Sequence, residues 1–263
     1  MSRGLFNVGN TCYFNSAVQC LAHVPTLTNR FLREGPYEGP CEVTREYSKL
    51  IRFMWCKGND PIDPSDLLTA FQNKFTDFVP RQQHDTHEAV LSLLDAFEKS
   101  LGLDYMKPIF YGKEDQVVTY PGGTSTRTHE FCSLFVDSPD HMQNYSKYHI
   151  LSDYVDDAGK KYNAAAMQTI IQKTGECMSV IFTQKCPVEF VPDTYNNLKL
   201  FGLVIHWGLS ANSGHYAVLV KHKKQWRMID DDVSVKIDAP DPRLICSMAW
   251  YKKVTSPLHD SSA

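Results

Sequence analysis

The spacing of the hydrophobic residues changes from a helical period to a strand period after about residue 107. Before that point, Phe14, Val18 and Leu21 recur at helical spacing and predict a helix that ends before Pro25. A second helix is expected to begin at residues 63–64, where an aspartate precedes a proline. Its apolar residues lie on one side: Leu67, Leu68, Phe71 and Phe75.

The clearest helical pattern covers residues 85–101. Its apolar residues fall on one face of a helix: Val90, Leu93, Leu94, Phe97 and Leu101. Gly102 follows directly and is a typical stop signal. We therefore expect the first hundred residues to be mostly helical.

Beyond residue 107 the chain consists of short apolar runs separated by turns. The tripeptide at 121–123, Pro-Gly-Gly, is the sharpest turn signal. Residues 128–136 and 177–184 are expected to be strands, with mixed polar structure over 149–171. Near the end, residues 197–206, 214–220 and 225–229 predict three consecutive strands. Helices followed by antiparallel strands indicate an α+β fold class, and residues 256–263 are expected to be a disordered tail.

One cysteine lies where the first helix is predicted to begin. Cys12 follows Asn10 and Thr11, which are both good N-cap residues, so its thiol would face unpaired N–H groups and the positive end of the helix dipole. This setting favours the thiolate, which is the nucleophilic form. The alternative is a small buried core residue, as most cysteines are.

A histidine and an aspartate occupy positions that two antiparallel strands can bring together. His215 opens one predicted strand and Asp230 ends the next, so one strand, a turn and one strand back separate them. With Cys12 they would form a Cys-His-Asp arrangement of nucleophile, base and orienting acid. The alternative is a hydrogen-bonded core histidine and a solvated acidic turn.

Together these segments resemble the catalytic domain of the ubiquitin-specific proteases, a family of papain-like cysteine deubiquitinases. Three motifs match in the family's order: a Cys box over residues 4–21, a Gln-Gln-His-Asp-Thr-His-Glu segment over 82–88, and a His box over 206–232. Residues 247–253 are similar to the family's last strand. The resemblance implies one catalytic domain over 1–263, with a helical thumb to about residue 106 and an antiparallel β palm over about 107–255.

In this family the sheet usually extends into a fingers region, often held by zinc through two Cys-x-x-Cys pairs. This chain has no Cys-x-x-Cys, and residues 110–186 contain only Cys132, Cys177 and Cys186. Structural zinc takes four closely placed ligands. We therefore expect shortened fingers, no metal and no cofactor. His87 lies three residues after His84, which is not the His-Glu-x-x-His pattern of zinc proteases, so these side chains are expected to face solvent or a partner.

The resemblance also implies catalytic roles. Cys12 matches the nucleophile, His215 the base and Asp230 the acid that orients the imidazole, while Asp231 can share or assist that role. Asn7 matches the side chain that donates to the oxyanion of the tetrahedral intermediate. Without the resemblance, Asn7 would be interpreted as a turn-forming residue.

Substrate-binding positions follow from the same motifs. Asp85 and Glu88 match positions that face the arginine-containing tail of ubiquitin, where charge-assisted contacts fix orientation. Asp85 could also cap its helix. His206 precedes a Gly-containing turn that could line the substrate channel, and a histidine there is more often a packing or hydrogen-bonding residue than a catalytic one. Gly214 and Tyr216 flank His215 in the His box.

Composition limits the remaining classes of function. The net charge of −3 gives no indication of nucleic-acid binding, and no apolar stretch reaches the length of a membrane span. The eight cysteines are scattered and do not resemble a disulfide framework, so we expect an intracellular location, cytoplasmic or nuclear. We expect a monomer whose partners are conjugates of ubiquitin or a ubiquitin-like modifier, with no nucleic acid and no membrane.

The sequence therefore predicts a deubiquitinase that hydrolyses the isopeptide bond after the terminal Gly-Gly of ubiquitin through an acyl-thioester on Cys12. Three alternatives stay open at this point. The modifier could be a ubiquitin-like protein, the chain could be an inactive ubiquitin-binding module, or it could be a structural interaction domain.

Overall fold

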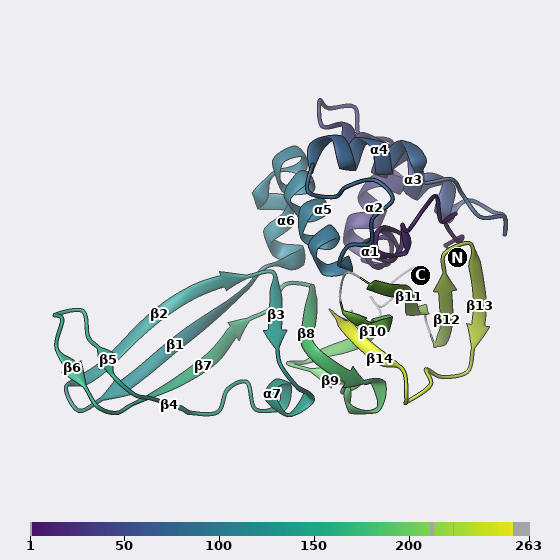
Figure 1. The fold of residues 1–263 in the computed structure, drawn as a ribbon. Coiled ribbons are helices and arrows are strands. Elements are labelled where there is room, and N and C mark those ends of the chain that lie inside the picture. Colours follow the sequence, from purple (N-terminus) through teal and green to yellow (C-terminus); the bar gives the residue numbers. More distant parts are fainter. Residues whose placement is uncertain (1, 211–212, 223, 255–263) are drawn as a thin grey trace, which may run out of the picture.

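The computed structural model describes residues 2–210, 213–222 and 224–254. The first part of the chain is helical, as expected, and its helices pack together above one sheet (Figure 1). They are α1 (Cys12–Ala22), α2 (Pro25–Arg33), α3 (Glu42–Trp55), α4 (Ser65–Lys74), α5 (Thr86–Leu101) and α6 (Leu103–Phe110). None of the helices in the described part of the chain combines the length and apolar character that crossing a bilayer requires.

The helix ends agree closely with the local signals. Asp85 is the N-cap of α5, and its side chain accepts a hydrogen bond from the N–H of His87, while Gly102 ends the helix with φ of +89°. The helix predicted from residue 63 begins slightly later, at Ser65, because Asp63 accepts from the Ser65 N–H at 2.9 Å and so acts from outside the helix.

The three strands predicted near the end of the chain are confirmed and lie side by side. They are β10 (Leu198–Ser210), β11 (Ser213–His222) and β12 (Gln225–Asp230). With β13 (Val233–Ile237), β14 (Ile245–Lys253), β8 (Cys177–Pro187), β3 (Ser133–Val136) and β9 (Thr194–Tyr195) they form an eight-stranded sheet, in the order β13-β12-β11-β10-β14-β8-β3, with β9 on β10. All neighbours are antiparallel except β3, which runs parallel to β8.

This sheet is buried on both faces. Val218 and Val220 of β11 point to the core shared with the helices, whereas Leu219 between them belongs to a second core on the opposite face. Helix α1 lies between the other helices and the sheet, and all of its 11 residues are buried. The first turn of α1 is therefore held rigidly against β11.

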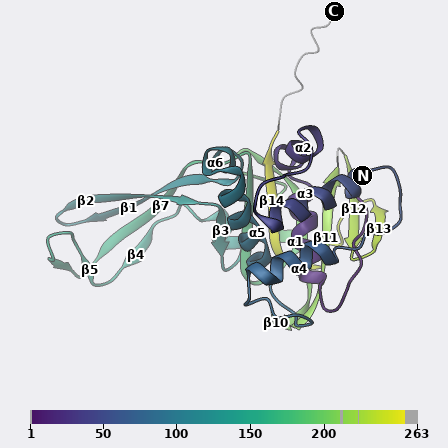
Figure 2. The same cartoon turned by 90° about the horizontal axis from the view of Figure 1, so that it is seen from above.

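The segment for which shortened fingers were predicted forms an arm that projects from the rest of the molecule (Figures 1 and 2). Its four-stranded sheet has the order β2-β1-β7-β4, and β5 pairs with β6 beside it. The strands are β1 (Gly112–Tyr120), β2 (Gly123–Phe131), β4 (His149–Leu151), β5 (Tyr154–Val155), β6 (Lys161–Tyr162) and β7 (Ala165–Lys173). Of the two short helical elements in this half of the chain, α7 (Pro139–Gln143) lies between β3 and β4 in the sequence, and η1 (Val188–Phe190) follows β8 of the central sheet.

The arm forms in a chain that has no Cys-x-x-Cys pair. β2 pairs with β1 over nine residues on each strand, from Gly112↔Phe131 to Tyr120↔Gly123, across the turn that the Pro-Gly-Gly signal predicted. The strand expected over 128–136 is divided at Cys132 between the arm and the central sheet. Among the described residues, Cys132, Cys177 and Cys186 form no cluster suited to a metal ion. The tail expected over 256–263 lies outside the described residues, and the single-domain organisation stays a prediction.

Candidate active site

Cys12 is the first residue of α1 and is almost completely buried. Thr11 is the N-cap, and Cys12 is 2 % exposed. Burial raises the pKa of the Cys12 thiol above its ordinary value, and hydrogen bonds from the backbone of Tyr216, Tyr13 and Cys12 itself only partly oppose this. The expectation that the helix end favours the thiolate is therefore wrong for the folded protein with Cys12 buried, because desolvation outweighs the effect of the helix N–H groups on the thiol pKa. A thiol in this setting needs a base to become a nucleophile.

Such a base lies on the strand that packs against α1. His215, near the start of β11, places Nε2 at 2.5 Å from Oδ1 of Asp230, the last residue of β12. Trp207 of β10 stacks on the imidazole at 5.9 Å between ring centroids and 19° between planes. When Nε2 carries the proton donated to Asp230, Nδ1 keeps its lone pair and can act as the base.

The structure brings the predicted trio of residues to one place. The Cys12 thiol is hydrogen-bonded to the backbone of Tyr216, the residue next to His215. His215 in turn bonds to Asp230. Cys12 comes from α1, whereas His215 and Asp230 come from the adjacent strands β11 and β12, more than half of the chain later.

Asn7 is held rigidly just before Cys12. Its Oδ1 accepts from the N–H groups of Gly9 at 3.0 Å and Thr11 at 3.2 Å, so it shapes the turn into α1. Its Nδ2 donates to Oδ2 of Asp231 at 2.8 Å. An amide nitrogen carries two hydrogens, so Asn7 can donate a second hydrogen bond. The turn-forming role and the donor role are therefore compatible.

Asp231 connects this turn to α1. Its Oδ1 accepts from Nδ2 of Asn15 at 2.8 Å, and its carbonyl accepts from the N–H of Leu5 at 2.8 Å. Burial raises the pKa of Asp231, against the effect of the hydrogen bonds from Asn15 and Asn7. The contacts of Asp231 are with Asn7 and Asn15, whereas Asp230 holds the imidazole.

A glycine allows this approach of the N-terminal segment to Asp231 and Asp232. A Cβ atom on Gly4 would lie 2.4 Å from the carbonyl oxygen of Asp232, so a side chain cannot be placed there. Asn15 was matched only as part of the Cys box, and sequence reasoning did not identify its contact with Asp231.

Gln83 is a second residue whose role sequence reasoning missed. Its Nε2 donates to the carbonyl of Gly214 at 2.6 Å, and its Oε1 accepts from the Gly214 N–H at 2.7 Å. Gly214 has φ of +137°, and a Cβ there would lie 2.3 Å from the carbonyl oxygen of Trp207. The Gln83 side chain thus clamps the backbone just before His215. Its position in the Gln-Gln segment next to Asp85 was the only signal in the sequence.

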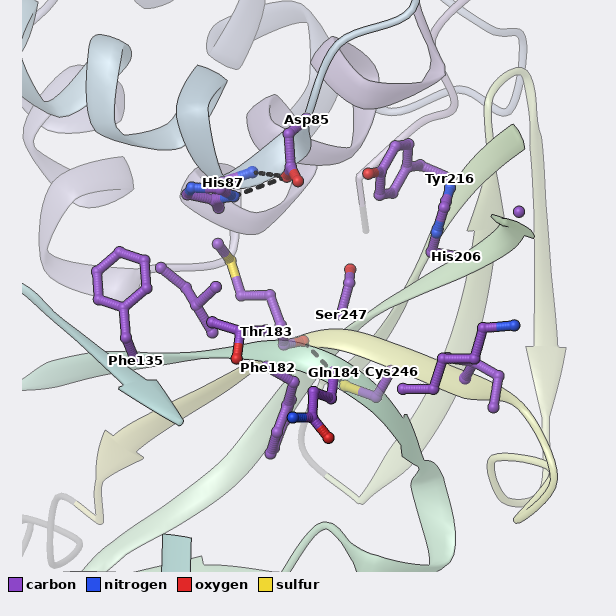
Figure 3. A pocket seen from close by; sticks show the side chains of 15 residues that line it. Asp85, His87, Phe135, Phe182, Thr183, Gln184, His206, Tyr216, Cys246 and Ser247 are labelled. Carbon is purple, nitrogen blue, oxygen red and sulfur yellow. Dashed lines mark hydrogen bonds and ion pairs between the residues drawn. The ribbon is translucent and has the colours of Figure 1, made fainter. Parts of the chain in front are cut away.

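A cavity of about 380 Å³ opens between α5 and the sheet, next to the His box (Figure 3). Asp85 and His87 border it from the N-terminal end of α5, and His206 and Tyr216 border it from β10 and β11. Opposite them, Thr183 and Gln184 of β8 and Cys246 and Ser247 at the start of β14 line it. Of the predicted substrate residues, Asp85, His206 and Tyr216 therefore line one cavity, while Glu88 is exposed in the first turn of α5.

The acidic and basic side chains that line this cavity are Asp85, His87, Lys185 and His206. Asp85 caps α5 and also lies 2.8 Å from Nδ1 of His87. Burial by itself lowers the pKa of His87, but the hydrogen bond and charge of Asp85, with the charge of Glu88, outweigh it and raise this pKa. Burial lowers the pKa of His206, whose ring stacks on Tyr216 at 4.3 Å. His206 is therefore a packing residue rather than a charged one.

Metal binding is not the best explanation of the polar clusters in the described part of the chain. Ligand atoms of His215, Asp230 and Asp231 lie within 4.8 Å of one another. Both carboxylate oxygens of Asp231 already accept hydrogen bonds, and His215 is paired with Asp230. His84 bonds to the Val79 carbonyl at 3.2 Å instead of joining His87.

Comparisons of the sequence with family models and of the fold with solved structures indicate the same kind of protein. The sequence model of the ubiquitin carboxyl-terminal hydrolase family matches residues 3–143 and 135–257. Among solved structures, the SAGA Ubp8/Sgf11/Sus1/Sgf73 DUB module bound to ubiquitin aldehyde has a similar fold, with a TM-score of 0.77 and 18 % identity over 96 % of this chain and 70 % of that one.

Curated relatives share the same family description. The chain is 34 % identical to human ubiquitin carboxyl-terminal hydrolase 15 over 129 residues, which are 44 % of this chain and 13 % of that protein. It is 36 % identical to Arabidopsis thaliana ubiquitin carboxyl-terminal hydrolase 9 over 118 residues, which are 40 % of this chain and 12 % of that protein. The matched part therefore spans only a small fraction of these much longer relatives.

Proposed function

The chain belongs to the ubiquitin carboxyl-terminal hydrolase family, and from this premise we propose that it is a cysteine-type deubiquitinase. Its reaction would be the hydrolysis of the isopeptide bond after the C-terminal Gly-Gly of ubiquitin. The observation that carries the proposal is the His215–Asp230 pair at 2.5 Å, on β11 and β12, beside the buried Cys12 thiol of α1, which contacts the backbone of Tyr216.

The first step is activation of the thiol. Nδ1 of His215 takes the proton from Cys12 Sγ while the sulfur attacks the carbonyl carbon of the last glycine. The raised pKa of Cys12 supports this order, since the resting residue is a thiol. Asp230 holds the imidazole in the required tautomer and stabilises the imidazolium that forms.

The second step is collapse of the tetrahedral intermediate. Its oxyanion accepts hydrogen bonds from the Asn7 amide and from the backbone N–H of Cys12 at the start of α1. The imidazolium of His215 gives its proton to the departing lysine amine, which leaves an acyl-thioester on Cys12. A water molecule, activated by the same imidazole, then hydrolyses the thioester and regenerates the thiol.

Substrate recognition is proposed for the cavity between α5 and the sheet. The tail of ubiquitin carries arginines before its Gly-Gly, and Asp85 on the cavity wall, with Glu88 beside it, would supply charge-assisted hydrogen bonds. Gly214, directly before His215, contributes no side chain to the site, because a Cβ there would lie 2.3 Å from the carbonyl oxygen of Trp207. Tyr216 and His206 form a flat stacked wall of the same cavity.

A panel of modifier probes tests the activity and the modifier together. Ubiquitin with a C-terminal electrophile should label the protein once, the Cys12→Ala variant should not react, and the matched Cys56→Ala variant, at an exposed cysteine, should react normally. Labelling only by a ubiquitin-like probe would assign another modifier. Binding of ubiquitin without reaction would instead identify an inactive binding module.

Recognition of the tail is tested with two substrates. Asp85→Ala combined with Glu88→Ala should lower kcat/KM for the full modifier by about ten- to a hundredfold, since a charge-assisted hydrogen bond contributes about 1.5–3 kcal/mol. A small acyl ester without arginines should be cleaved nearly as before. Asp66→Ala, in the first turn of α4, is the control. Equal losses on both substrates would show that Asp85 acts only as the cap of α5.

A further inference from the structure

Five lysines line one hollow at the end of the sheet that lies away from the catalytic residues. The hollow measures about 480 Å³ and is lined by Lys199, Lys221, Lys224, Lys252 and Lys253, together with Leu200, Phe201 and Val254. Lys221 lies six residues after His215 on β11, so the hollow is about 20 Å from the imidazole at the rise per residue of a strand. It is thus separate from the cavity proposed for the ubiquitin tail.

These lysines have no acidic partners within the described ranges, 2–210, 213–222 and 224–254. Other lysines do have them: Lys49 pairs with Glu46, Lys99 with Asp95, and Lys107 with Glu130. Yet the whole chain has a net charge of −3. The positive charge of the hollow is therefore a local concentration and does not reflect a generally basic protein.

The strand register places two of the lysines directly opposite each other. Lys199 of β10 and Lys252 of β14 are partners in the antiparallel pair. Like charges directly opposite across two strands are destabilising. Burial also lowers the pKa of Lys252, which indicates that its ammonium is poorly solvated. A bound anion would relieve both effects.

Aromatic rings hold two of the ammonium groups in place. Nζ of Lys252 lies 4.8 Å from the centroid of the Phe201 ring, and Nζ of Lys221 lies 5.2 Å from that of Trp226. Positioned cations lose less side-chain freedom when they bind a ligand than freely moving lysines do.

A second hollow shares Lys221 and Lys252 as a common wall. It measures about 330 Å³ and lies where β11 and β14 meet α2 and α3, and Figure 2 shows α2 next to the end of β14. Its apolar lining includes Pro25, Leu32 and Trp55. Trp55 is partly buried against the helical core and also borders this hollow, so its indole ring supplies a large apolar wall.

We propose that the two hollows form one docking groove for an acidic peptide segment of a partner protein, with carboxylates over the five lysines and one large apolar side chain beside Trp55. The apolar half of the groove favours a peptide over a nucleic acid or an inorganic polyanion, which would use only the cationic half. The net negative charge of the chain also disfavours long polyanions held by a general electrostatic field.

Fluorescence anisotropy with the full chain tests this groove. The probe is a labelled peptide with glutamates on both sides of a central leucine, and we expect saturable binding that weakens with salt. Lys199→Glu combined with Lys224→Glu, both at exposed positions, should weaken binding about tenfold or more, because two surface charge contacts become repulsive. Lys49→Glu combined with Lys99→Glu changes the net charge equally at lysines outside the groove and should leave binding unchanged.

Two further measurements separate the possible ligands. Replacement of the leucine by serine in the peptide should also weaken binding, and Leu32→Lys should remove that difference between the two peptides. Cleavage of a fluorogenic ubiquitin substrate should be equal in the lysine variants. Equal weakening in both double variants, indifference to the leucine, or tighter binding of duplex DNA or polyphosphate than of the peptide would overturn the proposal.

Discussion

The substitution Asp231→Asn separates the two neighbouring acids of the site. Both carboxylate oxygens of Asp231 accept from side-chain amides, Oδ2 from Asn7 and Oδ1 from Asn15, each at 2.8 Å. An asparagine at 231 has nearly the same shape, but one of its two terminal atoms becomes an NH2 group that faces another NH2 donor. Either Asn7 or Asn15 must then lose its partner.

The size of the effect follows from these two hydrogen bonds. One hydrogen bond to a charged group contributes about 1.5–3 kcal/mol. The pKa of Asp231 is raised by burial, so the carboxylate is itself costly to bury, and a neutral side chain offsets part of the loss. We therefore expect the free energy of unfolding to fall by about 1.5 kcal/mol, the lower end of the range for one such hydrogen bond.

The effect on catalysis should be larger than the effect on stability. If Asn7 is the residue that loses its anchor, the transition state loses a preorganised oxyanion donor, which typically costs about 2.7–4 kcal/mol. This corresponds to a decrease in kcat of roughly a hundred- to a thousandfold. Asp230→Asn should behave differently, because Asp230 is one-third exposed and contacts His215 rather than Asn7.

Urea unfolding and hydrolysis of a fluorogenic ubiquitin C-terminal amide measure the two quantities. Asp230→Asn is expected to lower kcat while it leaves the free energy of unfolding within about 1 kcal/mol of the wild type. Asp231→Asn is expected to lower both. Asp231→Ala removes the acceptors of both amides, so wild-type kcat in that variant would refute the role of Asp231 as the anchor of Asn7. An equal decrease in the free energy of unfolding for Asp230→Asn and Asp231→Asn would refute the stability contribution assigned to the contacts of Asp231 with Asn7 and Asn15.

Four other predictions concern the surroundings of the triad. Gln83→Ala removes both hydrogen bonds to the backbone of Gly214 and should destabilise the protein by about 1–3 kcal/mol, with a decrease in kcat, measured by melting and steady-state kinetics. The pKa of His87 is raised above 6.5 in the folded protein, so its pairing with Asp85 stabilises the folded state fully below pH 6.5. This stabilisation is lost as the pH rises through the raised pKa, and His87→Ala should therefore lower the melting temperature more at about pH 5 than at about pH 9. Because burial raises the pKa of Cys12 above 9.0, its alkylation by iodoacetamide should still accelerate with pH near that value, and a plateau near neutral pH would contradict this. Elemental analysis should find no stoichiometric zinc, and a chelator should leave the melting temperature unchanged.

Local signals in the sequence were sufficient for the ends of α5 and for the three consecutive strands β10, β11 and β12. Asp85 and Gly102 delimit α5 as predicted, because a cap and a stop act on backbone groups within a few residues. His215 and Asp230 meet as predicted, because adjacent strands joined by a short turn have few possible registers. Motif order then indicated the family, which the match over nearly the whole chain confirms.

Contacts between distant segments could not be predicted in this way. Asn15 reaches Asp231 across 216 positions, and Gln83 reaches Gly214 across 131. Neither polar side chain differs in the sequence from one that faces solvent. The extended arm was also not evident from its composition, since its strands are held mainly by pairing with one another and not by a buried apolar face.

The protonation state of Cys12 shows most clearly which properties the sequence determined and which only the tertiary structure decided. Sequence alone determined that the cysteine stands at a helix N-terminus, where N–H groups favour the thiolate. Only the tertiary structure decided that α1 is enclosed on all sides, so that desolvation raises the thiol pKa instead. The effect of the helix N–H groups on the thiol pKa depends on a few neighbouring residues. Desolvation depends on everything that excludes water from the site, which is a property of the folded chain as a whole.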